Sequence, residues 1–512
     1  MRKASGSLTA ILALGAFALA GASGTHAASA ASDQVERQAA FARELDQFIG
    51  RLRASPLAVP GTVVVAVHGD RTVFEKAYGV RHLATGAPMT LDTPVYNASV
   101  TKAYTGLLAA ILDADGKLPL SATLKDVWPG MTLPPPLDPS TVRISELLSH
   151  SGGIRAGGLN FRSVWTGQVE MSDVRAHLAK FATPTQPGFV YDNLGPFVWS
   201  SMAHSRTGVE WRDLLRQRVL TPLGLKRTSA RLEDFAKNEV ARCHPRVGGR
   251  WGPGVLKQTP VLNAAGGMYA SGRDEATFLK AFLTDGKSAN GRIPAAILRR
   301  TWQKESDQDQ AMWGLHRDGH GLGWDLGTIA GYRFVSRSGG YPGCRAISMF
   351  FPEHGLGVVV MSNGDAAANT YHATILAQAI ESWANPAKAE AQAPTRITAI
   401  HKVMAEAAAE ADKVDPRLAQ VKAIDPQVRA AMTGNYRNER LGDLKIVEQG
   451  SELAIIGGEM SIPLRYLGDN AFVAISDFGA SIERFEVIRD PSGRVTGFMW
   501  TDDRYERVGG TH

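Results

Sequence analysis

The chain has 512 residues, of which 44% are hydrophobic and 21% charged, and its formal net charge is +6 at pH 7. This composition is ordinary for a globular protein and excludes a disordered or fibrous chain. The charge is small and no dense Lys/Arg run is present, so the sequence does not predict nucleic-acid binding. A chain of this length has room for two or three domains.

The first thirty residues differ from the rest. Arg2 and Lys3 give a positive start, an Ala-rich apolar run extends from Leu8 to Leu19, and Ala28-Ser29-Ala30 fits a leader-peptidase site. This pattern is typical of a secretory signal peptide. The run is shorter than the about 20 residues that a spanning helix needs, and no Cys follows it to carry a lipid. The sequence therefore predicts a periplasmic or secreted protein without a stable membrane anchor.

Beyond this leader, the chain predicts a helix, a hairpin and a long helical stretch. Residues 32–53 carry apolar side chains at helical spacing, which indicates an amphipathic helix. Two alternating segments, Thr62 to Val67 and Thr72 to Tyr78, flank Gly69-Asp70 and predict a β-hairpin. Helical and loop-rich sequence follows from about Ser99 to Val261.

Strand patterns return later in the chain. They lie at Tyr332 to Arg337, Arg345 to Phe351 and Gly357 to Met361, with a turn at Pro352 to Gly355 between the last two. Strands therefore open and close this region, and helices lie between them. We expect the closing strands to pair with the opening ones in one antiparallel sheet on which helices pack.

From Asn385 the composition changes to Ala, Glu, Lys and Pro, which indicates a linker with one helix at about Thr395 to Lys413. Beyond it, short alternating segments separated by polar turns predict a small all-β barrel or sandwich. These segments are Leu444 to Val447, Leu453 to Ile456, Phe472 to Ile475, Ile482 to Val487 and Val495 to Trp500.

The chain has two cysteines, Cys243 and Cys344. An oxidising compartment permits a disulfide between them, but two free buried thiols fit the sequence equally well. Neither cysteine has metal-ligand spacing, so the sequence leaves these two alternatives open.

The only S-x-x-K in the chain is Ser99-Val100-Thr101-Lys102. Apolar residues from Val100 to Ile111 share one face of a helix that starts near Ser99. A serine in the first turn faces free N–H groups, and Lys102 lies one turn later on the same side. Such a lysine takes the hydroxyl proton or stabilises the alkoxide. Taken alone, the motif also fits a helix-capping serine beside a solvated lysine.

A second candidate motif is Tyr191-Asp192-Asn193. A tyrosine near ammonium groups holds a lowered pKa and relays protons. Asn193 has an amide that donates to a substrate carbonyl and accepts from the lysine. By itself, a turn with a core tyrosine explains the tripeptide as well.

The third motif, Arg337-Ser338-Gly339-Gly340, ends a predicted strand. Glycine lets a substrate backbone lie close to the strand, so that the N–H groups of Gly340 and Ser99 form an oxyanion hole. Arg337 or Ser338 is expected to hold a substrate carboxylate. An ordinary glycine-rich strand end has the same pattern.

In this order and spacing, the three motifs resemble the serine β-lactamase and penicillin-binding protein family, nearest its class C β-lactamase and D-Ala-D-Ala carboxypeptidase branch. Four further stretches resemble family segments: Leu147 to Gly153, Pro222 to Leu225, Ala265 to Met268 and Gly339 to Gly343. The resemblance covers about residues 55–385. It implies an α+β fold of the β-lactamase/transpeptidase type, an antiparallel sheet flanked by helices with an all-helical subdomain.

The resemblance also implies a role for each motif residue. Ser99 matches the acylated nucleophile, and Lys102 and Tyr191 match the proton-transfer pair. Asn193 matches the contact to the substrate amide. Gly339 is expected to contact the substrate, and the N–H groups of Ser99 and Gly340 form the oxyanion hole. Ser99 attacks a carbonyl, and water later releases the acyl group.

Some positions depart from the family pattern. Arg337 stands where the family has Lys or His, and Ser338 where it usually has Thr. Arginine keeps its proton, so a proton relay at this position is not expected. Asp192 replaces a small residue, and its carboxylate either points away or offsets the local positive charge. His150 and Trp324 are interpreted as a structural histidine and a core aromatic.

We therefore predict an exported serine hydrolase acting on amide, peptide or lactam bonds, D-Ala-D-Ala carboxypeptidase-like or β-lactamase-like. The alternatives are an esterase or D-aminopeptidase on the same site, and a catalytically retired binding module of the cell envelope. No cofactor or metal motif is found, so the expected partner is a small-molecule or peptide substrate. The β domain is expected to cap the active site or to bind a partner. The predicted domains are a signal peptide (1–30), a hydrolase domain (31–385), a helical linker (386–420) and a β domain (421–512).

Overall fold

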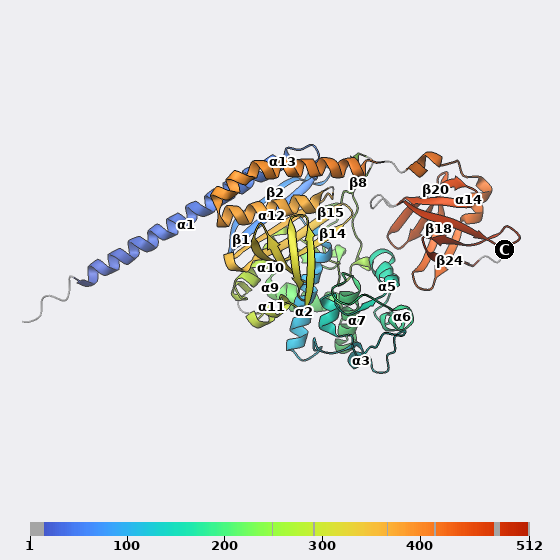
Figure 1. Cartoon of the computed structure of the whole chain (residues 1–512), viewed down its shortest axis with the longest axis horizontal. Helices are drawn as coiled ribbons and strands as arrows, with labels where there is room; N and C mark the ends of the chain where they lie inside the picture. Colours follow the sequence, from blue (N-terminus) through green and yellow to red (C-terminus); the bar gives the residue numbers. More distant parts are fainter. Residues whose placement is uncertain are drawn as a thin grey trace, which may run out of the picture.

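The computed structural model describes residues 15–247, 249–289, 292–365, 367–413, 416–475 and 482–509. The charged start of the predicted leader and much of its apolar run, residues 1–14, lie outside the described residues. Figure 1 shows a larger α+β body and a smaller barrel at the C-terminal side. Helix α1 (Gly15–Arg53) begins away from the larger body and then lies along it. Among the described residues, no helix has the length and apolarity to cross a membrane.

A nine-stranded antiparallel sheet is the centre of the larger body. Strand β1 pairs with β2 on one side and with β16 on the other, so the predicted pairing of closing with opening strands is confirmed. In spatial order the strands are β11 (Ser306–Met312), β12 (Leu315–His320), β13 (Asp325–Ile329), β14 (Tyr332–Tyr341), β15 (Cys344–Phe351), β16 (Leu356–Ser362), β1 (Gly61–His68), β2 (Arg71–His82) and β3 (Ala87–Pro88).

Helices cover both faces of this sheet. Val63 and Val65 of β1 belong to a core that includes α2 (Thr101–Ala114) and α10 (Gly272–Leu283). Val64 and Ala66 belong to a second core with α1 and α12 (Ala368–Ala384). Because side chains alternate across a strand, a continuously apolar β1 is expected for a sheet buried on both faces. Figure 1 shows α12 and α13 (Pro386–Ala411) together over one face.

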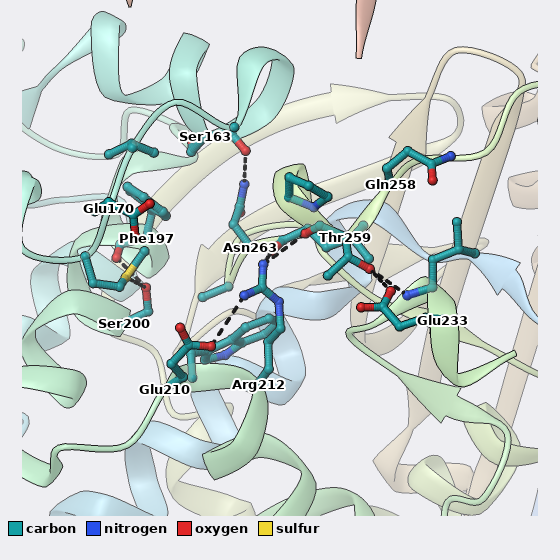
Figure 2. Close-up of a pocket in the computed structure, with 18 of the residues that line it drawn as sticks. Ser163, Glu170, Phe197, Ser200, Glu210, Arg212, Glu233, Gln258, Thr259 and Asn263 are labelled. Atoms are coloured by element: carbon teal, nitrogen blue, oxygen red, sulfur yellow. Dashed lines mark hydrogen bonds and ion pairs between the residues drawn. The ribbon is translucent and has the colours of Figure 1, made fainter. Parts of the chain in front are cut away.

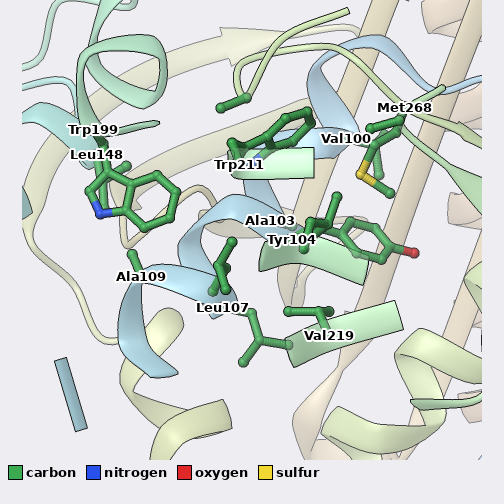
Figure 3. Close-up of a cluster of buried hydrophobic side chains, with 14 of the residues drawn as sticks. Val100, Ala103, Tyr104, Leu107, Ala109, Leu148, Trp199, Trp211, Val219 and Met268 are labelled. Atoms are coloured by element: carbon green, nitrogen blue, oxygen red, sulfur yellow. The ribbon is translucent and has the colours of Figure 1, made fainter. Parts of the chain in front are cut away.

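Helix α2 is enclosed by the rest of the larger body (Figure 3). Every residue from Thr101 to Leu112 is buried, including Lys102. Gly106 lies against the turn between β12 and β13, where a Cβ would stand 1.7 Å from the carbonyl oxygen of Leu322. The all-helical part beside α2 contains α3 (Leu124–Val127), α4 (Ile144–Leu148), α5 (Gly157–Phe161), α6 (Asp173–Phe181), α7 (Leu194–Thr207), α8 (Trp211–Leu215) and α9 (Thr221–Leu223), and α11 (Ala295–Thr301) follows α10.

Helix α13 starts earlier than the sequence predicted. It begins at Pro386 rather than near Thr395, and Asn385 caps it by accepting from the backbone N–H of Lys388 at 3.2 Å. An Asn followed by Pro is a common sequence at the start of a helix. The interpretation of residues 386–394 as a linker rested on their Ala- and Pro-rich composition and did not use this signal. The helix packs on α1 and α12 and buries Ile400 in the second core. The predicted boundaries at residues 385 and 420 stay predictions.

The C-terminal β domain is a closed antiparallel barrel, preceded by α14 (Pro426–Met432). All five segments predicted as strands lie in strands of this barrel, and the barrel rather than the sandwich is observed. β17, β20 and β24 were not predicted. The strands are β17 (Gly434–Asn438), β18 (Gly442–Gln449), β19 (Glu452–Gly457), β20 (Met460–Gly468), β21 (Ala471–Ile475), β22 (Ile482–Arg489), β23 (Val495–Trp500) and β24 (Asp503–Val508).

The two cysteines, which the sequence left open, form a disulfide between Cys243 and Cys344. Cys344 is the first residue of β15, and Gly343 before it contacts the backbone of His244. A Cβ on Gly343 would stand 2.5 Å from the His244 nitrogen. The disulfide therefore fixes the turn between β14 and β15 to a segment about a hundred residues earlier in the chain.

Candidate active site

Ser99 stands in a short 3-10 turn (Ala98–Val100) that leads directly into α2. Ala98 has φ +45°, a left-handed conformation that non-glycine residues rarely adopt. Gly339 of β14 approaches so closely that a Cβ on it would stand 2.8 Å from the Ser99 nitrogen. The neighbouring strand thus holds the turn in a conformation that places Ser99 beside β14.

Two side chains meet at the Ser99 hydroxyl, one from the next turn of the chain and one 92 residues later. The Tyr191 hydroxyl lies 2.8 Å from Ser99 Oγ, and Lys102 Nζ donates to the same oxygen at 2.9 Å. Lys102 Nζ also donates to Asn193 Oδ1 at 2.7 Å and to the Ala265 carbonyl at 2.6 Å. The structure therefore brings together the S-x-x-K and Y-x-N motifs singled out in the sequence.

Both proton-carrying groups beside Ser99 have shifted pKa values. Burial lowers the pKa of Lys102 to about 8, although Tyr191 opposes this shift. The ring of Tyr191 remains 44% exposed, but its hydroxyl lies among Ser99, Lys102 and Arg337. Loss of water raises the pKa of this hydroxyl, and the charges on Lys102 and Arg337 outweigh it and lower the pKa to about 8. A proton can thus pass between these groups near neutral pH.

Asp192 points away from Ser99, which decides between the alternatives left by the sequence. Its Oδ1 accepts from the Leu194 backbone N–H at 2.8 Å, at the start of α7. Its Oδ2 pairs with Arg155 Nε at 3.4 Å. The carboxylate therefore anchors the turn that presents Tyr191 instead of entering the cleft.

The two other singled-out residues lie in the interior. His150 is 5% exposed, and its ring lies 4.7 Å from the ring of Tyr191. Its Nδ1 accepts from the Asp192 backbone N–H at 3.4 Å, and burial holds its pKa well below the usual value. Trp324 is fully buried and packs against Phe282 and Phe350. Both positions therefore agree with a structural role.

Arg337 occupies a different position from the one expected of a carboxylate-binding residue. Its side chain is 3% exposed; Nε donates to the Ser99 carbonyl at 3.0 Å, and a terminal nitrogen donates to the Tyr191 hydroxyl at 2.8 Å. Its other terminal nitrogen lies 3.5 Å from the buried carboxylate of Asp325. Its donors thus already face internal acceptors, and the expectation that Arg337 holds a substrate carboxylate stays a prediction.

The rest of the third motif lines the open part of the cleft. Ser338 is half-buried, Gly339 is buried against the Ser99 turn, and Gly340 is exposed. A Cβ on Gly340 would stand 3.2 Å from the guanidinium carbon of Arg345. Arg345 in turn donates to the carbonyls of Tyr341 and Cys344 at 2.5 and 2.8 Å. This strand end thus presents open backbone beside a cation.

The cleft in front of Ser99 has a volume of about 510 Å³. Its lining combines neutral polar residues such as Asn193, Gln308 and Ser338 with charged residues and with aromatic or apolar ones. Size and lining are those of a small-molecule or peptide site. The aromatic and apolar wall residues are Phe189, Tyr191, Met312, Trp313 and Tyr341.

A second cavity of about 540 Å³ lies beside the segment whose carbonyl accepts from Lys102 (Figure 2). Asn263 Nδ2 donates to the Ser163 carbonyl at 2.9 Å, and Asn263 Oδ1 accepts from the Ala265 N–H at 2.9 Å. Arg212 donates to the carbonyl of Leu262 at 2.6 Å. These contacts fix the Ala265 carbonyl, and with it the position of the Lys102 amine.

The comparison with protein families decides the membership of the chain. The family model described as Beta-lactamase matches residues 45–381, which is most of the chain. The chain belongs to this β-lactamase family. The membership predicted from the three motifs, and the β-lactamase/transpeptidase-like fold, are confirmed. The protein is a β-lactamase-family serine hydrolase.

Relatives of this β-lactamase-family chain include penicillin-binding proteins and an amidase. Penicillin-binding protein 4 of Amycolatopsis lactamdurans is 28% identical over 327 residues, 61% of this chain and 83% of the relative. The octameric penicillin-binding protein homologue of Pyrococcus abyssi has a similar structure (TM-score 0.57, 21% identity, 90% of this chain and 98% of the other). D-amino acid amidase of Ochrobactrum anthropi SV3 is also similar (TM-score 0.57, 21% identity, 69% and 99%). At these identities the structures show the fold alone.

Three charged residues of this β-lactamase-family site carry no sequence signal and were missed. Asp325 holds Arg337, and Arg345 lines the cleft beside Gly340. Glu275 is 1% exposed and accepts from Tyr104 at 2.8 Å and from Ser348 at 2.6 Å. Each belongs to no short motif, so only the fold brings it to the site.

Proposed function

We propose that this protein is an exported hydrolase that forms an acyl-enzyme on Ser99 with compounds containing amide, peptide or lactam bonds. The single observation that carries the proposal is the position of Ser99 Oγ, 2.8 Å from the Tyr191 hydroxyl and 2.9 Å from Lys102 Nζ. A serine hydroxyl is a weak nucleophile until a neighbouring base takes its proton. The pKa values of about 8 suit both neighbours to that task near neutral pH.

The proposed reaction has two steps. Ser99 Oγ bonds to the substrate carbonyl carbon while its proton passes to the Tyr191 and Lys102 pair, and the N–H groups of Ser99 and Gly340 stabilise the oxyanion. The carbon–nitrogen bond then breaks as Tyr191 returns the proton to the leaving nitrogen. Water attacks the acyl-enzyme with the same pair as base, which releases the acid and frees Ser99.

The substrates that we favour are D-amino-acid peptides or amides and β-lactams. The similarity to penicillin-binding protein 4 and to D-amino acid amidase supports this class. The aromatic walls of the cleft suit apolar side chains on such a substrate. A terminal carboxylate has Arg345 rather than Arg337 to meet, because Arg345 lies beside the exposed Gly340.

The enclosure of Arg337 favours a second candidate, hydrolysis of esters or amides that bear no carboxylate. If neither Arg337 nor Arg345 binds a charge on the substrate, the substrate meets mainly aromatic side chains and neutral polar groups of the cleft. Such a site accepts neutral substrates without leaving a buried cation unpaired.

Two features support export. The leader pattern of the first thirty residues is that of a signal peptide, and the disulfide between Cys243 and Cys344 is the kind of bond that persists in oxidising compartments. The contacts that dock α1 on the larger body involve residues beyond the proposed cleavage site, such as Arg37 and Phe41. Cleavage after Ala30 therefore leaves these contacts in place. N-terminal sequencing of periplasmic and medium fractions tests this.

The test of the hydrolase proposal uses purified residues 31–512. Intact-mass analysis after a fluorophosphonate or a penicillin is expected to show one adduct on Ser99, and none in Ser99→Ala. A panel of nitrocefin, a D-Ala-D-Ala peptide, a D-amino-acid anilide and a p-nitrophenyl ester then identifies the substrate class. A folded wild-type protein that forms no adduct and turns over nothing in the panel would favour the retired binding module instead.

A further inference from the structure

Arg337 is held by a buried carboxylate that no sequence motif includes. Asp325, the first residue of β13, is 5% exposed and lies opposite Ser336, the neighbour of Arg337 on β14. Asp325 Oδ2 is 3.5 Å from Arg337, and it is also 3.5 Å from Nε of Arg317 on β12. The carboxylate thus stands between two buried guanidinium groups.

The other oxygen of Asp325 is fixed as well. Gln308 of β11 donates to Oδ1 at 3.0 Å, and His320 Nδ1 at the end of β12 lies 3.3 Å from it. Burial lowers the pKa of His320 to about 3, so this ring is neutral at working pH. Burial alone raises the pKa of Asp325, but the charges on Arg337 and Arg317 and the hydrogen bond from Gln308 outweigh it and hold the pKa below the usual value. The group is therefore an ionised carboxylate between two cations.

We propose that Asp325 is a positioning residue that keeps the guanidinium of Arg337 on the Tyr191 hydroxyl and out of the substrate cleft. The inference rests on the proposed function, because it assigns Asp325 a part in setting the proton transfer at Ser99. Arg337 lines the cleft, so that a rotation of its side chain would let it leave Tyr191 for solvent or a substrate anion. The ion pair with Asp325 opposes that rotation.

The consequence is electrostatic. Tyr191 is faced by Lys102 from α2, Arg337 from β14, Ser99 from the turn before α2 and the neutral ring of His150. Its own neighbour Asp192 is paired with Arg155. With Arg337 in place, two cations favour the phenolate form of Tyr191; without it, Lys102 alone remains. Asp325 therefore sets how readily Tyr191 accepts and returns a proton by holding Arg337 in place.

The test measures the second-order rate of fluorophosphonate labelling of Ser99 from pH 5 to 10, which needs no knowledge of the natural substrate. Wild type is expected to gain reactivity with a midpoint near pH 8, where Tyr191 and Lys102 lose a proton. Arg337→Met moves this midpoint to higher pH, because loss of a nearby cation raises the pKa of both groups. Asp325→Asn is expected to move the midpoint in the same direction, and the rate at pH 7 then falls about tenfold for every pH unit by which the midpoint rises.

The double variant decides the inference. If Asp325 acts through Arg337, adding Asp325→Asn to Arg337→Met changes neither the midpoint nor the rate further. An unchanged midpoint in Asp325→Asn, a shift to lower pH, or an additive shift in the double variant overturns the inference. A shift to lower pH would mean that Arg337 stays on Tyr191 without Asp325.

A folding control keeps the result interpretable. Asp325→Asn leaves Arg317 and Arg337 as two buried cations, so a second variant combines it with Arg317→Gln. That pair leaves one cation, the same net charge as the wild-type trio, and is expected to show the same shift to higher pH. Labelling of wild type distinguishes a failure of the proposed function from a failure of the role of Asp325. If wild type forms no adduct, the proposed function fails. If wild type reacts while the variants show no shift of the midpoint, only the role of Asp325 fails.

Discussion

The two arginines that line the active-site cleft sit in opposite surroundings. Arg337 comes from the middle of the sheet, is 3% exposed, and shares a buried network with Asp325 and the Tyr191 hydroxyl. Arg345 comes from the next strand, is half-buried, and is fixed by carbonyls of Tyr341 and Cys344 beside the exposed Gly340. Arg337 has a buried carboxylate as its partner, whereas the hydrogen bonds of Arg345 go to neutral carbonyls and the Asp365 carboxylate acts on it through its charge.

This difference favours two separate tasks, whereas the sequence predicted for Arg337 only the binding of a substrate carboxylate. A compensated cation in the interior biases a neighbouring pKa, because low dielectric strengthens its effect on Tyr191. A cation held by neutral carbonyls at the cleft keeps its charge available to a substrate anion. We therefore expect Arg337 to act on proton transfer at Tyr191 and Arg345 to meet a substrate carboxylate.

The largest expected effect is that of Arg337→Met. Because Arg337 acts on Tyr191 and not on the substrate, kcat/KM is expected to fall by about 10²–10⁴ for carboxylate-bearing and neutral substrates alike. The fold is expected to survive, since Asp325 keeps its contact with Arg317. Steady-state kinetics on a D-Ala-D-Ala peptide and a neutral ester measure this. A loss confined to the peptide would return Arg337 to the carboxylate-binding role predicted from sequence.

The strand end that carries Arg345 is held by the disulfide of its neighbour Cys344. Removing the bond with Cys243→Ala and Cys344→Ala is expected to lower the free energy of unfolding by about 2–4 kcal/mol, because the bond closes a long loop of the unfolded chain. Urea unfolding of the variant measures this, and wild type under a reducing agent is the matched control. Equal midpoints for oxidised and reduced wild type would contradict a stabilising role.

Arg345→Met is expected to have a smaller and selective effect. Loss of a charged hydrogen bond to a carboxylate lowers kcat/KM by about 10- to 100-fold for the D-Ala-D-Ala peptide and leaves the neutral ester nearly unchanged. Arg299→Met is the matched control, since Arg299 is an exposed arginine paired with Asp285. If both substrates lose activity equally, Arg345 supports the strand end and does not recognise the substrate.

The sequence predicted the reacting groups better than the residues that tune them. Ser99, Lys102, Tyr191 and Asn193 lie in short motifs whose local spacing already carries chemistry, and the structure joins them by hydrogen bonds. Asp325 does not lie in a short motif of this kind. Its partners come from β11, β12 and β14, and β11 and β12 are too polar to be recognised as strands by alternation of apolar residues. The pairing of Arg337 with Asp325 could not be predicted for the same reason, and binding of a substrate carboxylate by Arg337 stays a prediction.

The smallest expected effect is on the pH dependence of stability, and it comes from replacing Glu275. Glu275 is a second buried carboxyl and differs from Asp325 in its partners. Glu275 has neutral donors around it, among them Asn97, Tyr104 and Ser348, and burial raises its pKa to about 7. Between its ordinary pKa and 7, the folded state binds more protons than the unfolded state, so the free energy of unfolding falls as pH rises, by at most about 1.4 kcal/mol per pH unit.

Glu275→Gln keeps the acceptor for Tyr104 and Asn97 but loses this pH dependence. Urea unfolding at pH 5 and pH 7 measures the difference. Parallel pH dependence in both proteins would show that Glu275 is already ionised at pH 5, and that its neutral donors alone stabilise the charge as well as the guanidinium groups stabilise Asp325.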